Sequence, residues 1–342
     1  MSLSILSGED CYPALVISLD FELRWGVGGA VAGPGHPYWE NIAGARDAAD
    51  RILTLFEERN IHATWATVGF LFASSREDLE SFIPDSLPKY AKRNRNNYSL
   101  LRDDDNEADE VRFAPDIVAR IMESNGQELA SHSFSHYYCN ELGQDAETFT
   151  SDLHSAKRIA ERIGAYPTSY VFPSNQVNSS FLPLLSDAGF RVYRGNSHAA
   201  RPVFPGKIKS TMNRVWRGLD GYWNLTGHNT ISWADIVKES PRNVRASRFL
   251  RPGPSKSAVL RALQVRRTVK GFEEAVRRNE IYHLWWHPHN FGRDIESNIG
   301  SLERVLDGFE HLRETRGMRS LTMEEAALEA ERLQSLRVPE GK

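Results

Sequence analysis

Two histidines stand four residues apart in the stretch QELASHSFSHYY, which covers residues 127–138. Side chains at this spacing can reach one metal ion when the backbone between them is helical or tightly turned. A carboxylate from elsewhere in the chain would complete a two-histidine, one-carboxylate site with positions left open for water. His132 and His136 are therefore candidate ligands of one ion, or else two unrelated imidazoles in a polar turn.

Two carboxylates follow an early apolar run, in the stretch SLDFELRWG. Alternate side chains of a strand point to the same face, so Asp20 and Glu22 are predicted to emerge side by side at its carboxyl end. α/β folds build their sites at that edge of the sheet. Acids that simply end a strand in solvent are the other interpretation. Together with the two histidines, however, the pair supplies every donor that a metal site needs.

A third group of candidates stands in IYHLWWHPHNF, residues 281–291. Strand alternation puts His283, Trp285 and His287 on one face, and the proline that follows ends the ladder. His287 is thus predicted at the strand end, with Trp285 beneath it. The alternative is that the tryptophans belong to the core and that His287 and His289 are polar groups at its rim.

These residues need a sheet to bring them together, and the sequence alternates strand and helix patterns. An apolar run at 14–22, an amphipathic helical pattern at 41–60 and a second strand-like run at 62–72 come first. This β-α-β order predicts a parallel sheet or a barrel. Further strand-like runs stand at 127–133, 168–175, 190–196 and 280–288, and helical patterns at 301–317 and after Thr322, where Glu325 completes a capping box.

Composition indicates an ordinary globular protein: 342 residues, 40% hydrophobic and 25% charged, with a formal net charge of −3. No run reaches the roughly 18 apolar residues of a membrane span, and the first residues lack the pattern of a signal peptide. Cys11 and Cys139 are too few for a disulfide framework. We expect one catalytic domain over residues 1–342, located in the cytoplasm.

Two segments break the alternation of strands and helices. Residues 74–112 are polar, contain the acidic cluster DDDNEADE, and are predicted to be a surface insertion. Residues 242–270, inside a second insertion at 198–275, contain nine Lys or Arg residues and no acid. This basic stretch is either a solvated surface or a clamp for phosphate, on a substrate or at an anionic membrane. Its single aromatic residue, Phe249, argues against nucleic acid.

The chemical stretches, in this order and spacing, resemble the motifs of the polysaccharide deacetylase family (NodB homology, carbohydrate esterase family 4). They are DFE at 20–22, HSFSH at 132–136 and LWWHP at 284–288, with ATWATVG at 63–69 resembling the second strand and SYVFPSNQ at 169–176 the third motif. The resemblance spans about residues 13–195 and 280–325. It implies an α/β fold, a distorted (β/α)7-type barrel around one divalent metal ion, most commonly Zn²⁺.

The resemblance also implies a role for individual residues. The metal ligands match Glu22, His132 and His136, the catalytic base Asp20, and the general acid His287. Two departures stand out. The first motif has Phe21 between its two acids, as in the D-x-D/E branch of the family, and the arginine usual in the third motif is missing after Pro173. Either Arg191 or Arg194 could replace that arginine.

These roles predict a metal-dependent hydrolase that removes an N-acetyl or similar acyl group from an amino sugar. A divalent ion would activate water and polarise the carbonyl, Asp20 would take the water proton, and His287 would protonate the leaving amine. A backbone N–H near Ser174 or Asn175 could assist the oxyanion. The expected substrate contacts are Trp25, Ser174, Asn175, Gln176, Arg194, Trp286 and His289.

The expected substrate is a cytoplasmic precursor of a cell-surface polysaccharide, possibly phosphate-linked, with residues 242–270 touching its phosphates or a membrane surface. Two alternatives stay open. The same fold could hydrolyse a non-sugar linear or cyclic amide, as allantoinase-like relatives do, or the chain could be a non-catalytic carbohydrate-binding relative. Sites of this composition also accept iron, cobalt or manganese.

Overall fold

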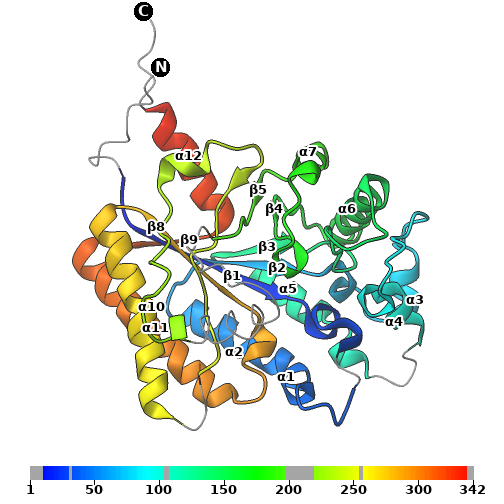
Figure 1. Cartoon of the computed structure of the whole chain (residues 1–342), viewed down its shortest axis with the longest axis horizontal. Coiled ribbons are helices and arrows are strands. Elements are labelled where there is room, and N and C mark those ends of the chain that lie inside the picture. The colour runs from blue at the N-terminus through cyan, green and yellow to red at the C-terminus, as the bar shows by residue number, and fades with distance from the viewer. Residues whose placement is uncertain (1–10, 31–32, 104–107, 198–218, 254–256, 337–342) are drawn as a thin grey trace, which may run out of the picture.

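The computed structural model describes residues 11–30, 33–103, 108–197, 219–253 and 257–336. Their centre is a curled parallel sheet with helices packed around it (Figure 1). The strands are β1 (Ala14–Phe21), β2 (Ala63–Thr67), β3 (Gln127–Ser131), β4 (Ser169–Tyr170), β5 (Val192–Tyr193), β6 (Arg242–Asn243), β7 (Arg248–Phe249), β8 (Ile281–Trp286) and β9 (Arg319–Leu321). The helices are α1 (Trp39–Ala43), α2 (Ala45–Glu58), α3 (Arg76–Glu80), α4 (Asn97–Asp103), α5 (Pro115–Glu123), α6 (Ala146–Glu161), α7 (Leu182–Asp187), α9 (Trp233–Ile236), α10 (Ala258–Arg278), α11 (Ile295–Arg316) and α12 (Met323–Ser335).

The strand order is β6-β5-β4-β3-β2-β1-β8-β7, and β9 pairs with the first half of β1. Each ladder between these strands is parallel. Among the described residues, β6 and β7 at the two ends of this order form no ladder with each other, so the sheet is a curled half-barrel. The predicted barrel class is confirmed.

Strand β1 runs through the middle of the sheet and is buried along its whole length. Leu15, Ile17 and Leu19 belong to the main hydrophobic core, which they share with the surrounding helices. Val16 belongs to a second core cluster, and Asp20 shares its side of the strand. Burial on both faces is what a parallel sheet covered by other elements requires.

The helical patterns predicted from the sequence are present. Ile52 and Phe56 of α2 and Leu302 and Phe309 of α11 are all buried in the main core. Burying each such side chain contributes about 1.5–3 kcal/mol relative to leaving it exposed. Helix α11 ends at Gly317, whose φ of 68° lies in the left-handed region that suits a glycine cap. No described helix has both the length and the apolar composition to cross a membrane.

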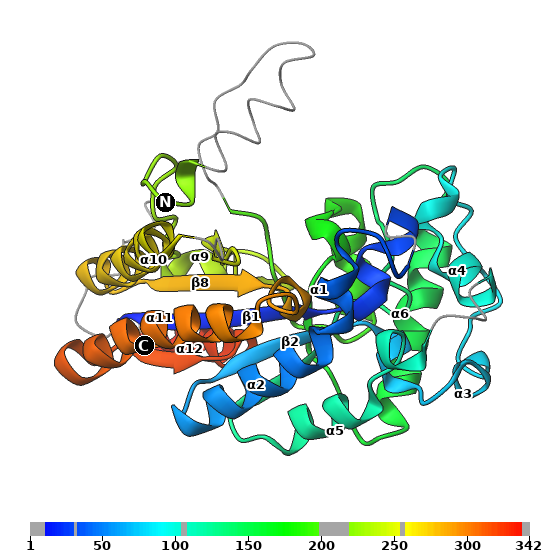
Figure 2. The same cartoon turned by 90° about the horizontal axis from the view of Figure 1, so that it is seen from below.

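The carboxyl ends of the parallel strands meet at one edge of the sheet. Figure 2 shows β1 and β8 running side by side toward that edge. Glu22 follows β1, His132 follows β3, Arg194 follows β5 and His287 follows β8. The fold therefore delivers side chains from four strands to a single place.

Residues 74–112 are more than the surface insertion that their polarity predicted. They contain α3 and α4, and Asn97, Tyr98 and Leu101 of α4 are buried. Tyr98 packs edge-on against Phe70, just beyond β2. This segment is therefore part of the structure around the carboxyl edge of the sheet.

Candidate metal centre

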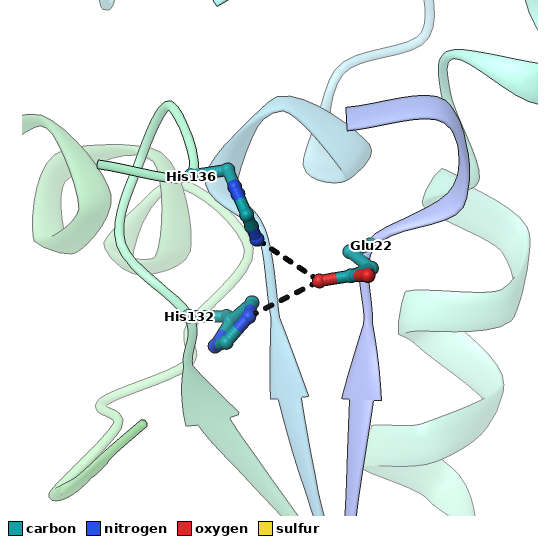
Figure 3. Close-up of side chains that lie close together, drawn as sticks. All are labelled: Glu22, His132 and His136. Carbon is teal, nitrogen blue, oxygen red and sulfur yellow. Dashed lines mark ion pairs between the residues drawn. The ribbon is translucent and has the colours of Figure 1, made fainter. Parts of the chain in front are cut away.

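Glu22 lies against both histidines of the HSFSH motif. Its Oε2 lies 3.2 Å from Nε2 of His132 and 3.0 Å from Nε2 of His136. Figure 3 shows the two imidazoles, which come from beyond β3, turned toward one oxygen of the carboxylate that follows β1. The three side chains are only 4%, 0% and 1% exposed. One ligand atom from each lies within 4.8 Å of the others, as a shared cation requires.

The protonation of these groups fits a divalent cation. Nδ1–H of His132 donates to the carbonyl of Val171 at 2.9 Å, which leaves the Nε2 lone pair facing Glu22. Among the described residues, that buried Nε2 has no hydrogen-bond partner. Burial acts to raise the pKa of Glu22, but the charge of His287 holds this pKa well below its usual value. An ionised carboxylate and an available imidazole lone pair are what a Zn²⁺ ion binds.

The two histidines converge through a tight turn and not through a helix. Ser133 and His136 have φ values of 62° and 58°, in the left-handed region. Gly69 N–H donates to the carbonyl of Ser133 at 2.9 Å, and Phe70 N–H to that of Phe134 at 3.1 Å. A Cβ at Gly69 would lie 2.8 Å from Cα of Phe134, so the glycine of ATWATVG allows this close approach.

The Glu22 side of the site is equally crowded. Glu22 is followed by a short 3-10 helix, Leu23–Gly26, whose last residue packs against the carboxylate. A Cβ at Gly26 would lie 1.8 Å from Oε1 of Glu22. The glycine is thus required by packing.

Asn97 joins the two sides of the site. Its Nδ2 donates to the carbonyl of Trp25 at 3.0 Å and to that of Ser135 at 2.9 Å. Trp25 stands three residues after Glu22, and Ser135 directly precedes His136. One buried amide from α4 therefore spans the distance between the carboxylate and the histidine turn. Sequence reasoning missed it, because no local pattern connects Asn97 to either motif.

Asp20 is held by Arg194. The guanidinium donates to Oδ1 and Oδ2 of Asp20 at 2.6 and 2.7 Å, to Oγ of Ser18 at 2.9 Å and to Oδ1 of Asn175 at 3.0 Å. Burial acts to raise the pKa of Asp20, but Arg194 keeps this pKa below its usual value. Arg191 instead points to Glu331 at 3.8 Å.

Arg194 is thus the arginine that contacts Asp20 in place of the one missing from the third motif. Its expected role as a substrate contact is corrected, because the guanidinium is buried against these partners and lies 4.3 Å from the ring centre of Trp285.

A histidine from the middle of β8 supports this pair. Nε2 of His283 lies 2.8 Å from Oγ of Ser18, and its Nδ1 lies 3.0 and 3.1 Å from the carbonyls of Val244 and Arg245. A carbonyl only accepts, so Nδ1 carries the proton and Ser18 donates to Nε2. Burial, with the charge of Arg194, lowers the pKa of His283 to about 3. This histidine is neutral and structural.

His287 faces both carboxylates from the end of β8. Its Nε2 lies 3.7 Å from Oδ2 of Asp20 and 3.6 Å from Oε1 of Glu22, and its side chain is 21% exposed. Nδ1–H donates to Oδ1 of Asn290 at 3.1 Å, and Nδ2 of Asn290 donates to the hydroxyl of Tyr38 at 2.9 Å. Sequence reasoning did not find Asn290 or Tyr38, although both orient this imidazole.

His289 lies behind His287. The two rings are stacked with their centres 4.8 Å apart, and Nδ1 of His289 is 3.7 Å from Oε1 of Glu22. Burial, with the charge of His287, lowers the pKa of His289 to about 3. It borders the site as a neutral ring.

The tryptophans expected at the substrate are corrected. Trp25 and Trp286 are 1% and 0% exposed and belong to the main core, so neither ring can stack on a sugar. The half-buried Trp285 is the one beside the site, with its ring centre 5.6 Å from that of His287 and 4.7 Å from that of Phe249. Strand alternation had already put Trp285, and not Trp286, on the face of His287.

The third-motif residues have different surroundings. Ser174 is exposed. Oδ1 of Asn175 accepts from Arg194, and the backbone N–H of Asn175 donates to the carbonyl of Phe172 at 2.9 Å, so this N–H is not available to an oxyanion. Oε1 of Gln176 accepts from the N–H of Asn140 at 2.9 Å. Asn175 and Gln176 therefore support the site walls.

The basic stretch 242–270 has internal partners for many of its charges, so the structure gives no support to the expected phosphate or membrane clamp. The ion pairs are Arg242–Glu331 at 2.7 Å, Arg245–Asp235 at 3.1 Å, Arg248–Asp220 at 3.3 Å, Arg267–Asp220 at 3.9 Å and Lys270–Glu273 at 3.4 Å. Arg267 is buried. Lys256 lies outside the described residues.

Comparison with known proteins agrees with the resemblance noted in the sequence. Residues 39–193 match the family model described as polysaccharide deacetylase. This segment includes His132 and His136, whereas Asp20, Glu22 and His287 lie outside it. No protein of curated function matches the chain.

Two solved structures assigned as polysaccharide deacetylases have a similar fold. One is from Mycobacterium smegmatis, with a TM-score of 0.59 and 14% identity over 97% of this chain and 93% of its own. The other is from Pseudomonas aeruginosa PAO1, with a TM-score of 0.52 and 13% identity over 96% and 92%. At these identities the likeness is one of fold.

Proposed function

Because residues 39–193 match the polysaccharide deacetylase family, we propose that this chain is a metal-dependent hydrolase that removes an N-acetyl or similar acyl group from an amino sugar. The observation that carries the proposal is the convergence of Glu22 with His132 and His136, at 3.2 and 3.0 Å. A divalent ion held there, most simply Zn²⁺, would supply the Lewis acidity that activates water and polarises an amide carbonyl.

Two side chains outside this ligand set are proposed to transfer the protons. In this proposal Asp20, kept ionised by Arg194, accepts the proton of the attacking water. His287 then protonates the leaving amine, a step that typically contributes 10²–10⁴-fold. Its Nε2 is the nitrogen that faces Asp20 and Glu22, because Asn290 occupies Nδ1. A base and an acid beside the same metal site suit amide hydrolysis.

The rings beside His287 are proposed to meet the sugar or the acyl methyl. Phe249 and Trp285 are half-buried, and the ring centre of Phe249 lies 5.7 Å from that of His287. Exposed ring surface beside a catalytic group favours a substrate with an apolar face, as a pyranose ring has. Ser174, exposed at the rim, and the neutral ring of His289 are retained as proposed substrate contacts.

The test combines metal analysis with product detection. The purified protein is analysed for bound metals, and acetate release is then followed on N-acetylglucosamine oligomers before chelation, after chelation and after return of Zn²⁺. We expect about one metal ion per chain and a loss of acetate release that returning the ion reverses. A metal-loaded protein that opens a cyclic amide but releases no acetate would favour the non-sugar hydrolase. Sugar binding without metal or turnover would favour the non-catalytic alternative.

A further inference from the structure

Asp152 belongs to none of the motifs in the sequence, yet its carboxylate contacts the turn between the two histidines. It lies on α6 and is 1% exposed. Oδ1 accepts from the N–H of Phe134 at 2.8 Å, and Oδ2 accepts from the N–H and the hydroxyl of Ser135 at 3.1 and 2.6 Å. Within the described residues, the hydrogen bonds of this carboxylate all go to that turn.

The turn needs such a partner. Ser133 and His136 hold left-handed backbone conformations, which cost about 1–3 kcal/mol each for non-glycine residues and persist only where the surroundings fix them. The N–H groups of Phe134 and Ser135 point into the protein, where an unpaired donor costs about 1–3 kcal/mol. One carboxylate satisfies both, with the added strength of a charged acceptor.

The other contacts of the turn come mainly from backbone groups. Gly69 and Phe70 supply N–H donors to its carbonyls, and Tyr137 N–H donates to Oγ of Ser133 at 2.6 Å. Asn97 binds its last carbonyl from the Glu22 side. Asp152 is therefore the charged side chain that fixes the turn from α6, on the side of its N–H groups.

We propose that Asp152 is a positioning residue of the metal centre. It holds the turn in the conformation that aims Nε2 of His132 and Nε2 of His136 at one cation, so its loss weakens cation binding before it affects chemistry. The inference rests on the proposed function for the existence of that cation. The test of the inference measures the affinity for the ion without substrate, so the inference can fail while the proposed function stands.

The test uses Asp152→Asn, which keeps the shape of the side chain but turns an N–H donor toward one of the two N–H groups. Metal-stripped protein is titrated with Zn²⁺ in competition with a chromophoric chelator at pH 7.5. We expect the dissociation constant to rise about 10- to 100-fold, the usual effect of removing such an outer partner. Acetate release should recover at saturating Zn²⁺.

Two further variants keep the test decisive. Ser135→Ala removes only the 2.6 Å hydroxyl bond and should weaken Zn²⁺ binding by a smaller factor, even if Asp152→Asn does not fold. Glu128→Gln is the matched control: this carboxylate lies on β3, the strand that leads to His132, but accepts from Thr64 and Glu324 and not from the turn.

The outcomes separate cleanly. Weaker Zn²⁺ binding in Asp152→Asn or Ser135→Ala, with Glu128→Gln at the wild-type value, supports the inference. Wild-type affinity in every folded variant overturns it, even if the melting temperature falls, since a purely structural role would lower only the latter. If the unaltered protein binds neither Zn²⁺ nor iron, cobalt or manganese, the proposed function and the inference fall together.

Discussion

Arg194 and Asp20 meet across the inside of the curled sheet, joined by two parallel hydrogen bonds of 2.6 and 2.7 Å. Arg194 follows β5 and Asp20 lies on β1, with β4, β3 and β2 between them in the sheet order. The curl of the sheet is what brings the two side chains into contact. A bidentate, fully buried pair of this kind fixes both the position of the carboxylate and its charge.

Replacing Arg194 by lysine should therefore change the pH dependence of turnover. Lysine keeps the charge but cannot form both hydrogen bonds, so the pKa of Asp20 should rise toward its usual value. Because the base must be ionised, the acid limb of the kcat/KM profile should move to higher pH, and the loss of turnover should be confined to acidic pH. Arg191→Lys, at the exposed pair with Glu331, is the control. An unmoved acid limb would show that Arg194 does not tune the base.

Substitutions of Asp20 and of His132 should have different effects on metal content and turnover. Asp20→Asn removes the proposed base but no ligand, so metal content should stay near that of the unaltered protein while acetate release falls by about 10²-fold or more. His132→Ala removes a ligand and should lose both metal and turnover. Elemental analysis and an acetate assay on the same preparations measure the two effects. Near-normal turnover in Asp20→Asn would contradict its assignment as the base.

His287 can be examined through the leaving group. His287→Ala should lower kcat on an N-acetyl amino sugar by about 10²–10⁴-fold, since an amine leaves only when protonated. An aryl acetate leaves as a stable phenolate, so the same variant should lose far less on that ester. His154, exposed on α6, supplies a control substitution. Equal losses on the two substrates would argue that His287 acts on a different step.

His283 predicts how stability changes in acid. Burial, with the charge of Arg194, lowers its pKa from the usual 6.5 to about 3. The unfolded chain therefore binds a proton that the folded chain excludes, so the stabilisation is fully present above pH 6.5 and is lost as the pH falls toward 3. At pH 5.5 the loss from this one group amounts to about 1.4 kcal/mol.

His283→Gln removes that titration. The fall in the free energy of unfolding between pH 7.5 and pH 5.5, measured by urea denaturation, should be smaller in the variant by about 1.4 kcal/mol. The comparison uses the change with pH, so a uniform loss of stability from the substitution does not affect it. Equal falls in both proteins would mean that His283 is already protonated in the folded state or remains solvated.

Local patterns in the sequence predicted β1 to β5, β8 and the helices α2, α11 and α12, but not β6, β7, β9 or α10. They also predicted that Glu22 meets His132 and His136. Strand alternation put Asp20 and Glu22 on one face, and the parallel order put them at the edge where His132 emerges. The same alternation predicted Trp285 as the ring beside His287. The expectation that Trp286 contacts the substrate was inconsistent with this alternation.

The supporting residues could not be found in this way. Asp152, Asn97 and Asn290 reach the site from two helices and a turn, and no periodicity relates them to the motifs they contact. A composition count of residues 242–270 also cannot see that Asp220 and Glu331, distant in sequence, pair with several of their charges. Pairing across the fold is a property of tertiary structure.

The amide of Asn97 bears on the order of assembly. It joins the turn after β1 to the turn after β3, although α4 is adjacent in sequence to neither turn. The strands can pair without α4, but the pocket for a cation is complete only when α4 docks. Tight binding of an ion should therefore depend on the docking of α4 and follow the pairing of the strands.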